Sequence, residues 1–97
     1  MKETEVLDKH IILNNKLIFC KDVEGEIIFL HKKERELYEL TKTADFIWRK
    51  AVAGKTVGQI IEAMQKKYVK VEKEILKRDT LDFVDDLLKR EIFCLKK

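Results

Sequence analysis

The spacing of apolar residues changes near Leu40, and this change predicts which parts of the chain are strands and which are helices. Up to that point the apolar residues form short clusters typical of β-strands, at 11–13, 17–20, 27–30 and 37–40. Beyond it the i, i+3, i+4 and i+7 spacing of an amphipathic helix begins, with Ala44, Ile47, Trp48 and Ala51. We therefore predict an α+β fold in which a three-stranded antiparallel sheet is followed by three helices.

Two polar segments in the strand-forming part are suited to chain reversal. Asn14 and Asn15 tolerate positive φ, and Gly25 can close a hairpin turn that begins at Asp22. These segments predict two antiparallel connections. The charged segment 31–35 contains no glycine, and we assign it to a loop.

Capping residues indicate where the helices begin and end. Thr41 or Thr43 can cap the first helix, and Gly54 stands where a left-handed residue would end it. Thr56 and Gln59 form a capping-box pattern at the start of the second helix. A long third helix is predicted from about residue 72 to residue 90.

The third helix has a wide apolar stripe. At about 100° per residue, Leu76, Phe83 and Leu87 lie close together, whereas Leu81 and Leu88 widen the stripe to about 160°. A helix that rests on one core needs about 100°. We expect the flank of Leu81 and Leu88 to stay partly uncovered, unless loops of the sheet bury it.

Composition indicates one domain, residues 1–97, with a core at about 10–93. Apolar residues make up 45% of the 97 positions, enough to build a core. The 21 basic and 18 acidic residues nearly balance, which is typical of a solvated surface rather than a polyelectrolyte.

The chain shows no membrane or export signal. Its longest apolar runs are too short for a spanning helix, and residues 1–8 lack the apolar stretch of a signal peptide. A cytoplasmic protein is therefore expected. Cys20 and Cys94 form no CxxC motif, so we expect both to be reduced and structural.

Groups for catalysis or metal binding are few. His10 and His31 are the only histidines and are expected at the surface. Gly54 and Gly58 lack P-loop spacing. Four carboxylates are expected to spread over an exposed helix face, too dispersed to hold a cation: Asp79, Asp82, Asp85 and Asp86. We predict no catalytic residue, metal or cofactor, and no enzyme.

Between residues 16 and 93 a series of individually weak motifs occurs in a characteristic order. They are 17–22, Gly25, 28–30, 37–41, Ala44, Ile47-Trp48, Gly54, Thr56-Val57, Ile60 or Ile61, Met64, Tyr68, Asp79, Phe83, Val84, Leu87 and Ile92-Phe93. In this order they resemble the PqqD family, the prototype of the recognition elements that bind precursor-peptide leaders during the maturation of peptide natural products. The sequence departs from the family pattern at Thr41, at 32–34 and at 89–91.

The resemblance implies a winged-helix-like fold that adds the leader as a strand beside its third strand, against the third helix. If 35–40 is the sheet edge, Leu37 and Glu39 face one side and Tyr38 and Leu40 the other. The expected peptide contacts are Arg35, Glu36, Leu37, Tyr38, Glu39, Lys77, Leu81, Val84, Asp85 and Leu88. The other flank of the helix, near Ile75, Asp79 and Asp86, is the alternative.

The partners that the resemblance implies are the precursor leader peptide and a separate maturation enzyme, either a radical SAM enzyme or a leader peptidase. The alternative function is that of a winged-helix transcriptional regulator that binds DNA. Residues 72–91 carry five basic and seven acidic side chains, so their net charge of −2 would repel phosphates. A basic surface remains available to DNA, at Arg49, Lys50, Lys55, Lys66, Lys67 and Lys70. Charge on the longest helix disfavours a nucleic-acid partner.

Overall fold

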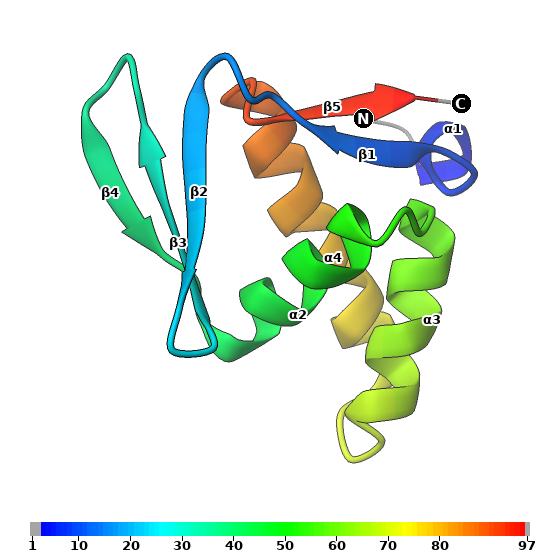
Figure 1. Cartoon of the computed structure of the whole chain (residues 1–97). Coiled ribbons are helices and arrows are strands. Elements are labelled where there is room, and N and C mark those ends of the chain that lie inside the picture. The colour runs from blue at the N-terminus through cyan, green and yellow to red at the C-terminus, as the bar shows by residue number, and fades with distance from the viewer. Residues whose placement is uncertain (1–2, 97) are drawn as a thin grey trace.

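The computed structural model of the protein describes residues 3–96, and in the central part of the chain three strands are followed by three helices, as predicted (Figure 1). The elements are α1 (Glu3–Val6), β1 (His10–Leu13), β2 (Ile18–Val23), β3 (Glu26–His31), β4 (Glu36–Glu39), α2 (Lys42–Val52), α3 (Val57–Lys67), α4 (Lys73–Lys89) and β5 (Phe93–Lys96). The short helix α1 and the final strand β5 are additions to the predicted elements.

The predicted three-stranded antiparallel sheet is formed by β2, β3 and β4, in that order. Glu24 and Gly25 make the turn between β2 and β3, with φ of 53° and 83°. Two consecutive positive φ angles define a type I′ hairpin turn, which glycine enters without strain. The Asp22 carboxylate accepts the N–H of Gly25 at 3.0 Å and holds the turn closed. The turn predicted at 22–25 is therefore confirmed.

The hairpin predicted at Asn14 and Asn15 is wrong, because β1 pairs with β5 rather than with β2. The N–H of Asn14 donates to the carbonyl of Ile92 at 2.9 Å, and its side-chain amide donates to the carbonyl of Glu91 at 3.0 Å. These bonds tie the end of β1 to the chain that follows α4. Leu13 consequently lies opposite Phe93, about 80 positions further along the sequence.

The three long helices begin and end near the predicted residues. Thr41 caps α2 by accepting the N–H of Ala44 at 3.2 Å, and Gly54 follows the helix with φ of 91°. Thr56 and Gln59 form the predicted capping box of α3, each side chain bonded to the other residue's backbone N–H. These local signals lie within a few residues of each helix end.

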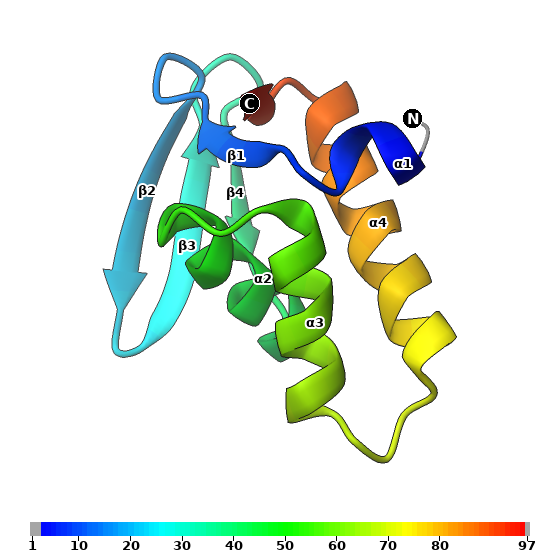
Figure 2. The same ribbon diagram turned by 90° about the vertical axis from the view of Figure 1, so that its right-hand side faces the viewer.

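The core lies between the sheet and the helices, which cover one face of the sheet (Figures 1 and 2). Aromatic rings connect the two layers. Trp48 is 1% exposed, and its ring stacks on Phe29 with centroids 4.8 Å apart. Trp48 also contacts Phe93, with ring centroids 5.5 Å apart, and Phe93 meets Phe83 of α4 edge to face at 6.1 Å.

His31 is buried, and the expectation of a surface histidine is wrong at this position. Its exposed fraction is 4%, because strand alternation turns it toward the same sheet face as Phe29. The ring Nδ1 accepts the backbone N–H of Glu34 at 3.1 Å. His31 therefore helps to shape the loop that leads into β4.

None of the helices in residues 3–96 has the length and apolar character that a membrane crossing requires. Both cysteines are free, with Cys20 half-buried and Cys94 exposed. Burial raises the pKa of the Cys20 thiol, so this cysteine stays protonated at neutral pH.

Candidate functional site

The outer edge of β4 is open within the part of the chain that the structure describes. β4 ends the strand order and is paired with β3. The N–H of Leu40 donates to the carbonyl of Ile27 at 3.4 Å, and only alternate residues of an antiparallel strand bond to a given neighbour. Tyr38 therefore directs its backbone groups toward β3, while Leu37 and Glu39 direct theirs outward. Such an edge can accept another strand.

The side chains of β4 alternate as predicted. Leu37 is 66% exposed and Glu39 is exposed on the face of the sheet that points away from the helices. Tyr38 is half-buried on the opposite face, where its ring stacks on Phe29 with centroids 4.8 Å apart. A strand added beside β4 would consequently place one side chain next to Tyr38, toward the helices, and its two neighbours on the outer face.

A polar cluster joins β4 to the end of α4. The Tyr38 hydroxyl donates to Glu36 at 2.9 Å and also contacts Glu34 at 3.2 Å. It accepts a hydrogen bond from Arg90 at 3.2 Å, and the Arg90 guanidinium lies 5.9 Å from the centre of the Tyr38 ring. The bond to Glu36 raises the pKa of Tyr38, and the bond to Asp86 raises the pKa of Arg90. Tyr38 is therefore neutral and Arg90 charged at neutral pH.

The flank of α4 next to β4 is the one that carries Asp86 and Arg90. Arg90 bonds to Asp86 at 3.2 Å and reaches Tyr38 from this side. Leu81 lies nine residues before Arg90, which at about 100° per residue places it on the opposite side of the helix. Leu88 lies on the Leu81 side. Both leucines are half-buried and pack against the core, so the predicted partial exposure is confirmed.

The remaining predicted contacts are divided between the two elements. Arg35 and Glu36 lie exposed at the start of β4, and Arg35 has φ of 58°. Lys77 and Asp85 are half-buried on the flank of α4 that carries Leu81. Val84 is 0% exposed, so its prediction as a peptide contact is corrected: the side chain is enclosed in the core.

Sequence reasoning missed Arg90 as a neighbour of β4, although its ion-pair partner Asp86 was named on the alternative flank of the helix. The i, i+4 spacing of Asp86 and Arg90 predicts a helical ion pair but says nothing about which strand it faces. Phe83 was expected to be core, and the structure leaves it half-buried against Phe93. The contact between Tyr38 and Arg90 spans 52 positions and depends on how α4 packs.

The opposite edge of the sheet, at β2, is also unpaired among the described residues and borders a pocket of about 420 Å³. Leu13, Ile27 and Trp48 form much of its apolar lining. Arg49 closes one end through bonds to Asp22 at 3.2 Å and to the carbonyl of Gly25 at 2.9 Å. These bonds tie the hairpin end of β2 to α2.

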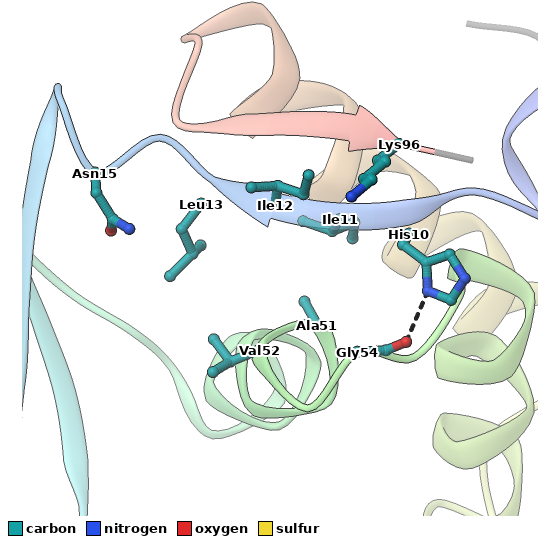
Figure 3. Close-up of a pocket in the computed structure, with 9 residues that line it drawn as sticks. All are labelled: His10, Ile11, Ile12, Leu13, Asn15, Ala51, Val52, Gly54 and Lys96. Carbon is teal, nitrogen blue, oxygen red and sulfur yellow. Dashed lines mark hydrogen bonds between the residues drawn. The ribbon is translucent and has the colours of Figure 1, made fainter.

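A further open pocket of about 490 Å³ lies between β1 and the end of α2 (Figure 3). His10 crosses its rim and donates from Nδ1 to the Gly54 carbonyl at 2.7 Å, which links β1 to the end of α2. His10 and Lys96 are the titratable side chains among its nine lining residues. Within residues 3–96 no three metal-binding side chains of the His, Cys, Asp or Glu type gather at one point.

Comparison with known proteins matches residues 26–92 to the family described as coenzyme PQQ synthesis protein D (PqqD). No curated protein matches the sequence. The structure of TbiB1 in complex with the TbiA(beta) leader peptide is similar, with 22% identity, a TM-score of 0.73 and coverage of 84% of this chain and 92% of that one. Lasso peptide synthetase B1 complexed with the leader peptide has 19% identity, a TM-score of 0.75 and coverage of 88% and 98%. The two TM-scores establish a shared fold, and at identities this low the similarity concerns the fold alone.

Proposed function

Because the chain belongs to the PqqD family, we propose that it recognises the leader segment of a ribosomally synthesised precursor peptide and binds it as a strand added to β4. The observation that carries this proposal is the open edge of β4 beside the Arg90 flank of α4. The two solved proteins of the same fold are complexes with leader peptides. The family match, 26–92, includes β4 and α4 but not β2, which favours the β4 edge over the β2 edge.

The geometry of β4 defines which contacts recognise a bound leader. The backbone of the leader pairs with the outward-directed groups of Leu37 and Glu39. The leader side chain opposite Tyr38 points toward α4, near Phe83 and Arg90. Backbone pairing supplies affinity without regard to sequence, and this inward side chain supplies selectivity.

In this proposal the chain binds the leader and delivers the precursor peptide to a separate maturation enzyme, which carries out the chemical modification. A radical SAM enzyme and a leader peptidase are the two enzyme classes that we expect as partners. Holding the leader keeps the attached core peptide near the enzyme at an effective concentration on the order of millimolar. Binding of the leader is therefore the activity to measure.

We expect the protein to bind a synthetic leader peptide, encoded beside its gene, with micromolar or tighter affinity, about 8 kcal/mol or more. Raising the salt concentration should change this affinity little, because backbone pairing and apolar contacts dominate. Isothermal titration calorimetry at low and high salt measures both quantities.

The DNA-binding alternative makes the opposite prediction. A regulator would bind a duplex with an affinity that falls steeply with salt, since each phosphate contact releases counterions. Absence of leader binding, together with salt-sensitive binding to a defined duplex, would refute the proposed function in favour of that alternative.

A matched pair of substitutions tests which flank of α4 faces the leader. Asp86 lies on the Arg90 flank and Asp85 lies nearer the Leu81 flank, and each forms an i, i+4 ion pair, with Arg90 and with Lys89. We expect Asp86→Trp to obstruct the added strand and weaken leader binding at least about tenfold, or about 1.4 kcal/mol. Asp85→Trp should leave it nearly unchanged.

Both variants lose one i, i+4 ion pair at the helix surface, which contributes about 0.3–0.5 kcal/mol, so the loss of the pair should lower their thermal stabilities by similar amounts. The two affinities measured under identical conditions then report the position of the leader. A larger loss for Asp85→Trp would instead support the contacts predicted from sequence at Lys77, Leu81, Asp85 and Leu88.

A further inference from the structure

The face of the sheet that points away from the helices carries a row of exposed apolar side chains. Phe19, Leu30 and Leu37 lie side by side on β2, β3 and β4, because the register pairs Phe19 with Leu30 and Leu30 with Leu37. Their exposed fractions are 60%, 38% and 66%. The helices in residues 3–96 all lie on the other face (Figures 1 and 2). Large exposed apolar side chains that lie next to one another are typical of interaction surfaces.

The next row of side chains on this outer face carries opposite charges at its two ends. Lys21, Ile28 and Glu39 are aligned across the three strands in the same way. Lys21 stands on the β2 side and Glu39 on the β4 side, with half-buried Ile28 between them. The outer face therefore has an apolar centre, a basic end on one edge strand and an acidic end on the other.

We infer that this outer face binds a second copy of the chain in a symmetric dimer. A two-fold axis that lies between the sheets and parallel to β3 places each β2 over the β4 of the second copy. Phe19 then faces Leu37 of the second copy, Leu30 faces Leu30, and Lys21 faces Glu39. Every apolar side chain of the first row meets another, and both charged pairs have opposite signs.

Sheet geometry permits this arrangement. Two sheets pack face to face about 10 Å apart with strands crossing at about 30°, a spacing that these side chains can fill. A two-fold axis perpendicular to the strands would instead place β2 over β2 and β4 over β4 of the second copy, so Lys21 could not face Glu39 and this complementarity would be lost. In the parallel arrangement the outward-directed backbone groups of Leu37 and Glu39 lie at the side of the dimer, and both β4 edges stay open.

Charge exchange tests the inferred pairing directly. Sedimentation velocity of the full chain from about 10 to 300 µM should show a concentration-dependent dimer. Lys21→Glu sets two pairs of acidic side chains against each other, and Glu39→Lys does the same with basic ones. Each single variant should raise the dimer dissociation constant at least about tenfold. The double variant restores opposite charges and should return it to within about threefold of the original protein.

Phe19→Ser is a second, uncharged variant, and it should also raise the dissociation constant at least about tenfold. All four substituted proteins should keep the far-ultraviolet circular dichroism of the original, because these side chains are exposed or at the sheet surface. A monomer throughout the concentration range overturns the inference. So does a dimer that the single variants leave unchanged, and so does a double variant that stays as weak as either single one.

Discussion

Leu37→Pro is expected to abolish measurable leader binding while the domain remains folded. The backbone N–H of Leu37 points away from β3, so its loss removes a donor to the leader and leaves the ladder to β3 intact. Proline also places its ring at the edge where the leader strand would approach. Titration calorimetry with the leader peptide should show at least about a hundredfold loss of affinity, or about 2.7 kcal/mol.

Two neighbouring variants separate the lost backbone donor from other effects. Leu37→Ala keeps the N–H and should lower affinity far less than Leu37→Pro. Tyr38→Pro removes a donor that bonds to β3, so it should destabilise the sheet itself and lower the melting temperature. If Leu37→Pro binds the leader as well as the original protein, the leader does not pair with β4, and the β2 edge becomes the candidate.

Trp48→Ala is expected to lower the free energy of unfolding by about 3–5 kcal/mol. The indole is 1% exposed and contacts the rings of Phe29 and Phe93, whose centroids are 4.8 and 5.5 Å away. Its removal leaves a cavity between the sheet and the helices, which the surrounding rings can fill only partly. Urea unfolding followed by circular dichroism measures the change, a large fraction of the total of about 5–15 kcal/mol for a domain of this size.

Phe46→Ala is the matched control on the same helix. Phe46 is half-buried, meets Tyr68 edge to face at 6.4 Å, and has the ammonium of Lys67 at 4.5 Å. Its truncation creates no enclosed cavity and should cost less than half as much as that of Trp48. If both variants lost the same free energy of unfolding, the packing of the rings around Trp48 would not depend on its indole.

Several parts of this structure follow from residues that are close together in the sequence. The capping box of Thr56 and Gln59 and the turn at Glu24 and Gly25 act within four residues, so their outcome depends little on the rest of the fold. The alternation of Leu37 and Tyr38 is equally local, because a strand turns successive side chains to opposite faces. The strand half of the proposed leader site was therefore predictable.

The helix half of that site was decided by tertiary packing. The periodicity of α4 identifies its buried stripe, but a stripe has a flank on each side. The packing of α4 on α3 and β5 decides that the flank with Arg90, rather than the flank with Leu81, faces β4. The pairing of β1 with β5 has the same origin. Its residues are about 80 positions apart, so no local signal in the sequence indicates the pairing. Local sequence determined the helices and strands of this protein and which of their faces are exposed. The packing of the core determined which elements contact one another, because all apolar faces must be buried at the same time.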